Sequence, residues 1–297
     1  MRQRLNRPLF LIVLLLILSL YVSETSSQEQ KSFLWKVQSK KNTVYLLGSI
    51  HFLKKEIYPL PRKIEEAFDR SAVLVVEADV SRLDPKVLQK LTEAAFYPEN
   101  ETLESHVSPE TFSLIKQEFA GIGFPVELIQ KQKPWFLALT ISALSYVKMG
   151  LDPTYGIDIY FLSKAQGKKK ILELESLEEQ FQFLSQLSDR EQESLLIYEL
   201  KSENVIEQET NHMVQAWLTG DVRGMESILN QGIRQDPQLS SVYDKMIDER
   251  NRKMALKIEE FLAAGEDYLV IVGAGHLVGD QGIPEILRRK GYSVEQL

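Results

Sequence analysis

The sequence Thr43-Val44-Tyr45-Leu46-Leu47-Gly48-Ser49-Ile50-His51 has a counterpart near the other end of the chain, Asp267-Tyr268-Leu269-Val270-Ile271-Val272-Gly273-Ala274-Gly275-His276. Each segment is a run of apolar, β-branched and aromatic residues that stops at Gly-x-x-His. Such a run, closed by a glycine that permits a sharp turn, is typical of a buried strand. In open α/β sheets, ligands and metals bind at the ends of such strands. We therefore expect two neighbouring strands that aim His51 and His276, two of the four histidines in the chain, at one point.

Further strands and helices are predicted around these two segments. Apolar runs predict strands at 33–37, 72–78 and 170–174, with an edge strand at 292–295. Helical patterns cover 61–70, 84–130 with breaks near three prolines, 134–146, 156–167, 175–264 and 282–290. The sequence therefore predicts an α/β fold. Its central β-sheet is built from strands near both termini and is surrounded by helices, with a helical middle segment, and residues 28–297 form a single domain.

The composition is that of a globular protein without thiol chemistry. The 297 residues are 44% hydrophobic and 26% charged, and they contain no cysteine, which excludes disulfides and thiolate metal sites. The formal net charge is −7, and beyond the N-terminus the only basic run is Lys168-Lys169-Lys170. No nucleic-acid partner is therefore expected.

The N-terminal residues 1–27 have the order of a secretory signal. Arg2, Arg4 and Arg7 precede an apolar run at 9–22, and a polar stretch follows at 23–31. The apolar run is shorter than the ~18 to 20 residues of a spanning helix. We expect export to the periplasm or the extracellular space, with cleavage after Ser27. The alternative is an uncleaved anchor, with membrane association through residues 9–22.

The histidine pair admits two interpretations. His51 and His276 are both ligands of one divalent metal ion, or one is a ligand and the other a general base; imidazole suits zinc, manganese, iron or cobalt. The alternative is that each histidine caps a loop and bonds a carbonyl. The repetition at equivalent strand ends favours the functional interpretation.

Glu77 stands at the end of an otherwise apolar strand, where a carboxylate is costly unless it is paired or bound to a metal. It is a candidate third metal ligand or catalytic acid or base. A salt bridge to a buried arginine, or an exposed strand end, is the structural alternative. Asp79, two residues further on the same face, is an alternative ligand.

Glu175 and Arg250 are the remaining catalytic candidates. Glu175 follows a predicted strand and could act as a general base for water, although acidic residues are also common in the first turn of a helix. Arg250 could hold a carboxylate or stabilise an oxyanion, although it could equally be solvated on a charged helix. Neither the Gly-x-Ser-x-Gly frame of serine hydrolases nor the His-Glu-x-x-His zinc motif occurs.

Further segments accompany the two Gly-x-x-His motifs in a characteristic order: 58–61, 75–79, 133–135, 156–158, 174–180, 250–251 and 282–292. In this combination the chain resembles the TraB/GumN family, which includes the Tiki proteases, over about residues 33–297. The bacterial, exported GumN-like branch is the most similar. The resemblance implies an α/β sheet with surrounding helices, as in erythromycin-esterase and ChaN-like folds.

The resemblance also implies a chemistry, because Tiki-like members are metal-dependent proteases. Carried over to this chain, His51, Glu77 and His276 would hold a divalent metal ion (manganese, cobalt or zinc), which would lower the pKa of its bound water. Glu175 or Arg250 would assist. We therefore expect an exported metal-dependent hydrolase that acts on a peptide or a small ester or amide.

Two other functions remain open at this point. The first is a non-catalytic protein of this family that sequesters a peptide or small molecule in the same pocket. The second is a haem- or iron-binding role like that of ChaN-type relatives.

Overall fold

A computed structural model describes residues 31–81, 84–201, 203–231 and 238–297. The segment 1–27 lies outside these ranges, so its role as a signal or anchor stays a prediction. In the part of the chain that is described, no helix has the length and apolar character needed to cross a membrane.

The sheet is six-stranded in the described ranges and has the order β4-β3-β5-β2-β1-β6. Its strands β2, β3, β4 and β5 are parallel, β1 is antiparallel to β2, and β6 is antiparallel to β1. Every predicted strand is present, and the α/β class is confirmed. The strands are β1 (Leu34–Gln38), β2 (Thr43–Ser49), β3 (Val73–Val76), β4 (Lys170–Glu173), β5 (Tyr268–Gly273) and β6 (Ser293–Gln296).

The central strands are covered on both faces. Successive side chains of a strand point to opposite faces, yet every residue of β3 is buried, as are almost all residues of β2 and β5. Continuous apolar runs are characteristic of parallel strands with helices on both sides. The edge strands β4 and β6 have only partly buried and exposed residues.

The register brings the ends of three strands together. Strand β5 lies between β2 and β3, with Gly273 opposite Ser49 and Ile271 opposite Val76. The prediction that the two Gly-x-x-His strands are neighbours is therefore confirmed. Glu77 directly follows β3, so it lies at the same edge of the sheet.

Proline and glycine residues mark several ends of the helices. Pro109 and Pro134 are the first residues of α4 and α5, where a missing N–H costs nothing. The predicted helical region 175–264 is divided, in one place at Gly220, whose positive φ of 67° separates α9 from α10. Apart from short 3-10 turns, the helices of the described ranges are α2 (Arg62–Arg70), α3 (Pro85–Ala95), α4 (Pro109–Gly121), α5 (Pro134–Lys148), α6 (Ile157–Ala165), α7 (Leu177–Ser185), α8 (Asp189–Lys201), α9 (Glu203–Thr219), α10 (Val222–Leu229), α12 (Gln238–Tyr243), the π-helical η5 (Asp244–Asp248), α13 (Glu249–Ala263) and α14 (Ile283–Arg289).

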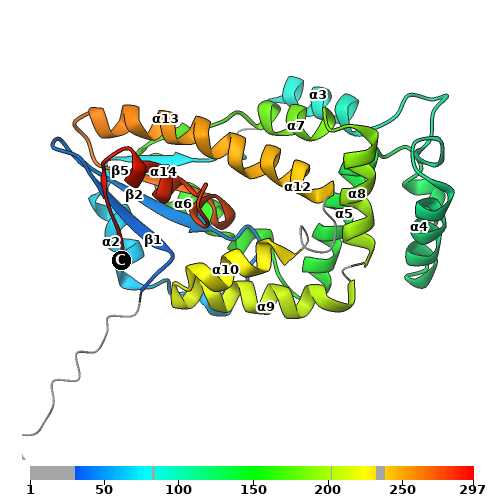
Figure 1. The fold of residues 1–297 in the computed structure, drawn as a ribbon, viewed down its shortest axis with the longest axis horizontal. Coiled ribbons are helices and arrows are strands. Elements are labelled where there is room, and N and C mark those ends of the chain that lie inside the picture. The colour runs from blue at the N-terminus through cyan, green and yellow to red at the C-terminus, as the bar shows by residue number, and fades with distance from the viewer. Residues whose placement is uncertain (1–30, 82–83, 202, 232–237) are drawn as a thin grey trace, which may run out of the picture.

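The sheet occupies one end of the molecule, and the helical middle segment extends from it to α4 at the far end (Figure 1). One large apolar core surrounds the sheet. A separate core joins α4, α5 and α8 around Ile115, Leu137 and Leu196, so the helical part has apolar packing of its own.

Gly48 is required by close packing rather than by its backbone angles. A Cβ at this position would lie 2.5 Å from Cδ1 of the fully buried Phe33 and 3.2 Å from the backbone of Ala274. We predict that Gly48→Ala lowers the free energy of unfolding by about 1–3 kcal/mol, because a methyl group is forced into a filled core.

The matched control is Gly265→Ala, where an added Cβ meets no atom within 4 Å. This variant should stay within about 0.5 kcal/mol of the wild type in urea denaturation. Equal stability of the two variants would contradict the packing argument.

Candidate active site

Three of the residues predicted to form the site, Glu77, His276 and His51, gather around Gly273. A Cβ placed on this glycine would lie 3.5 Å from Oε2 of Glu77, 3.5 Å from Cδ2 of His276 and 3.8 Å from Nε2 of His51. The three side chains come from the ends of β3, β5 and β2, as the sheet register requires. The absence of a side chain at Gly273 leaves the space between them open.

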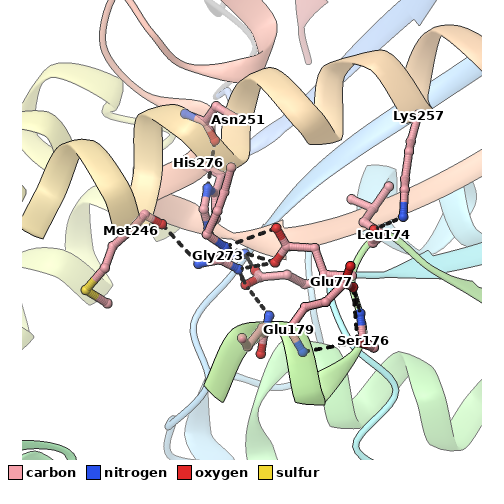
Figure 2. Close-up of polar contacts among 12 residues, drawn as sticks. Glu77, Leu174, Ser176, Glu179, Met246, Asn251, Lys257, Gly273 and His276 are labelled. Carbon is pink, nitrogen blue, oxygen red and sulfur yellow. Dashed lines mark hydrogen bonds and ion pairs between the residues drawn. The ribbon is translucent and has the colours of Figure 1, made fainter. Parts of the chain in front are cut away.

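Three groups hold the carboxylate of Glu77. Its Oε2 accepts a hydrogen bond from the backbone N–H of Gly273 at 2.8 Å, and its Oε1 accepts one from Gln180 at 2.9 Å. The guanidinium of Arg250 also donates to Oε1. Figure 2 shows Glu77 at the centre of these contacts, below α13.

Glu77 is ionised in this setting. Burial by itself disfavours the charged form, since only 16% of the side chain is exposed. The charges of protonated His276 and of Arg250, together with the Gly273 N–H, outweigh burial and lower the pKa of Glu77 to about 2. For Glu77, the sequence left open a salt bridge to a buried arginine as the alternative to metal binding. That salt bridge is present in this structure, with Arg250.

Arg250 on α13 joins both candidate carboxylates. Its NH2 group lies 2.7 Å from Oε2 of Glu175 and also contacts Glu77, while its Nε donates to Glu175 at 2.9 Å. Arg250 and Glu175 are only 13% and 12% exposed. Glu175 is thus part of the cluster, but it lies against Arg250 rather than beside the two histidines.

His276 is buried, and Asn251 sets its orientation. The Nδ2 amide of Asn251 donates to the carbonyl of Gln281 at 2.8 Å, so its Oδ1 faces Nδ1 of His276 at 2.7 Å. Nδ1 therefore carries the proton, and the lone pair of Nε2 points toward Glu77, whose Oε1 lies 3.7 Å away. Burial lowers the pKa of His276 to about 4, so the ring is neutral at neutral pH.

His51 has a different environment, although its motif is the same. Its Nδ1 lies 3.1 Å from Oδ2 of Asp158 on α6, and Oδ1 of the same carboxylate accepts a hydrogen bond from Ser49 at 3.1 Å. Partial loss of hydration of the ring opposes protonation, but the hydrogen bond and charge of Asp158 outweigh it and raise the pKa of His51 to about 9. His51 is 57% exposed, so it forms the solvent-accessible side of the site.

The donor set can be tested for its fit to a divalent metal ion. Both histidines bond an oxygen acceptor through Nδ1, so Nε2 of the neutral ring is the atom left for a ligand, an arrangement typical of metal-binding imidazoles. Oε2 of Glu77 accepts only one hydrogen bond and so retains a lone pair. The donor chemistry therefore fits.

The present positions of the side chains do not complete such a site. In the described ranges, no group of three or more His, Cys, Asp or Glu side chains is placed so that it could hold a metal ion. Gln180 and Arg250 both bond Oε1 of Glu77, which explains why the carboxylate is aimed at them.

Three residues of the cluster were not assigned to it from the sequence: Asp158, Gln180 and Asn251. Each lies within a segment on which the family resemblance rests, which is the signal that could have identified them. Asp79, the alternative ligand, is not part of the cluster, because its Oδ1 accepts hydrogen bonds from the backbone and hydroxyl of Ser81.

Comparison with known proteins gives a family match across almost the whole described chain. The model of the TraB/PrgY/gumN family matches residues 33–296. The chain is 31% identical over 245 residues to the uncharacterized protein YbaP of Escherichia coli (strain K12), covering 82% of this chain and 87% of YbaP.

More distant relatives carry the name metalloprotease. The chain is 25% identical to the metalloprotease TIKI homolog of Amphimedon queenslandica, covering 97% of this chain and 67% of that protein. It is 22% identical to metalloprotease TIKI1 of Danio rerio, covering 92% of this chain and 64% of TIKI1, so it spans less than two thirds of the latter. No solved structure matches the chain significantly.

The ion pair of Glu77 predicts an acid-sensitive fold. Because the folded pKa of Glu77, about 2, lies below its ordinary value of 4.5, the carboxylate stabilises the fold above pH 4.5. This stabilisation is lost as the pH falls toward 2. We predict that Glu77→Gln lowers the free energy of unfolding by about 3 kcal/mol at pH 7 and flattens its decrease between pH 4.5 and pH 2.

Urea denaturation at a series of pH values measures both effects. Glu66→Gln, which removes an exposed carboxylate paired with Arg62, is the control and should follow the wild type. A pH profile of Glu77→Gln parallel to that of the wild type would contradict the low pKa of Glu77.

The Asp158 contact predicts the protonation of His51. In Asp158→Asn the carboxylate charge is lost, so the pKa of His51 should fall from about 9 toward its ordinary 6.5. Titration of the imidazole resonances by NMR, in protein kept free of metal with a chelator, measures this value. Ser49→Ala keeps the carboxylate and should leave the pKa of His51 near 9; equal pKa values in all three proteins would refute the assignment.

Proposed function

Because the chain belongs to the TraB/PrgY/gumN family, we propose that it is a metal-dependent hydrolase that cleaves peptide bonds with water activated beside Gly273. The observation that supports this most directly is the convergence of His51, His276 and Glu77 at the ends of three adjacent strands. Two relatives that are named metalloproteases, and that align with most of this chain, support the same chemistry.

In the proposed enzyme, His51, Glu77 and His276 hold a divalent ion such as manganese, cobalt or zinc. When bound, the ion supplies a water of lowered pKa and polarises the carbonyl that is attacked. Asp158 and Asn251 orient the two imidazoles. Arg250 keeps Glu77 ionised and fixes its position.

The two histidines have unequal roles in this proposal. His276 is neutral and can bind an ion without losing a proton, whereas the imidazolium of His51, which Asp158 stabilises through Nδ1, must first lose its Nε2 proton. A site with these two ligands takes up its ion more readily as the pH rises.

We also propose that the protein acts after export, with residues 1–27 as a signal peptide or anchor. The order of basic, apolar and polar residues in this segment is the support for this proposal.

A second candidate function is sequestration of a peptide without hydrolysis. The contacts of Glu77 favour it, because Gln180, Arg250 and the Gly273 N–H hold the carboxylate. In this alternative the same pocket binds the peptide and releases it unchanged.

The test is the metal content of the purified protein by elemental mass spectrometry, beside its hydrolysis of a fluorogenic peptide library. We expect about one equivalent of metal in the wild type. His51→Ala and His276→Ala should lose the metal, and their activity should fall by about 100-fold or more.

His212→Ala is the matched control, since this histidine is exposed on α9 and should keep both metal and activity. Circular dichroism shows whether each variant is folded. A wild type that takes up no manganese, cobalt or zinc, and releases peptides uncleaved, would overturn the hydrolase proposal in favour of sequestration.

A further inference from the structure

Two cavities, of about 310 and 340 Å³, meet at the candidate site. Ser49, His51, Phe52, Glu77 and Gly273 line both of them. The first cavity continues along the ends of β3 and α6, past Val80 and Ile159. The second cavity reaches α9, α10 and η5. The candidate site therefore lies where the two cavities meet.

The second cavity has an apolar wall that comes from the helical segment, which the sequence motifs do not cover. Met213 on α9, Met225 and Leu229 on α10, and Ile247 in η5 line it. Two of these side chains come close to the second Gly-x-x-His motif. A Cβ on Gly275 would lie 3.3 Å from Leu229 and 3.7 Å from Ile247. The apolar wall thus begins one residue before His276.

The charged groups that line this cavity already have partners. Arg250 contacts Glu77 and Glu175, and His51 contacts Asp158. A charged ligand group would have to compete with these buried pairs, whereas an apolar group would only displace water from an apolar wall.

The cavity is also large enough for a bulky group. An apolar cavity of about 150 Å³ can accommodate a benzene ring. The 340 Å³ present here therefore has room for a leucine, methionine or phenylalanine side chain together with part of the adjoining backbone.

We propose that this cavity binds a bulky apolar side chain of the substrate peptide, next to the bond that lies over Gly273, with Leu229 limiting its size. This inference rests on the peptide hydrolase function proposed above. It adds the class of substrate residue that the enzyme recognises. Because the other cavity continues the same hollow beyond His51, the peptide extends across the site, with the bond to be cleaved between the two cavities.

Binding of capped peptides that differ at one position tests this proposal independently of turnover. The full-length wild-type protein should bind peptides with phenylalanine, leucine or methionine at that position about 10-fold or more tightly than those with serine or aspartate, measured by calorimetry. Leu229→Ala should shift the preference toward larger aromatic groups. Leu229→Trp should shift it toward alanine and valine.

Ile228→Ala is the matched control, because Ile228 is the neighbouring partly buried residue of α10 and does not line the cavity. It should keep the wild-type preference. Binding that is indifferent to the varied residue, or a preference that neither Leu229 variant changes, would overturn the proposal.

The same peptides, analysed by mass spectrometry after incubation, report on hydrolysis separately. Selective binding without cleavage would support the binding role of the apolar cavity and refute the proposed hydrolase activity. Cleavage without selectivity would support the hydrolase activity and refute the binding role of the cavity. If Leu229→Trp fails to fold, Leu229→Ala alone decides the dependence on Leu229.

Discussion

The ion pair between Glu77 and Arg250 is the interaction on which the arrangement of the site depends. Glu77 ends the most completely buried strand, where an unpaired carboxylate would be strongly destabilising. Arg250 compensates this charge from α13, and it also binds Glu175 from the segment after β4. One guanidinium thus ties together three segments that are far apart in the sequence. A buried pair of this kind fixes geometry more than it adds stability, because its attraction is offset by the loss of hydration.

Two copies of one motif have become chemically different through their neighbours. Both motifs end a parallel strand with histidine, but a charged acceptor, Asp158, faces His51 and a neutral acceptor, Asn251, faces His276. The first favours an imidazolium and the second a neutral ring. A pair of titratable groups whose environments separate their pKa values is characteristic of sites that move protons. Because these neighbours occupy Nδ1 of each ring, Nε2 is the atom that remains for a ligand; it has a free lone pair on the neutral His276, but on His51 only after the ring has lost a proton.

The sheet and the helical segment contribute different parts of the site. The ends of β2, β3 and β5 supply His51, Glu77 and His276, which are positioned by the hydrogen-bonded register of the strands. The apolar walls come from α9, α10 and η5. A change in these apolar side chains can therefore alter which ligand fits while the polar cluster stays the same, as is common where sites are carried on a rigid scaffold.

The sequence by itself determined the strands, the α/β class and the candidate residues His51, Glu77 and His276. These follow from local patterns: apolar runs that stop at glycine, and polar side chains that stand at the ends of such runs. The breaks of the helices at prolines were also determined locally. Tertiary structure alone decided the strand order, which places Gly273 between the other two strand ends, and the partners of each side chain. Nothing local to Glu77 shows that Arg250, 173 positions away, contacts it, or that Asp158 faces one histidine and Asn251 the other. Contacts across such separations depend on how the elements pack, and packing is a property of the whole chain rather than of any one segment.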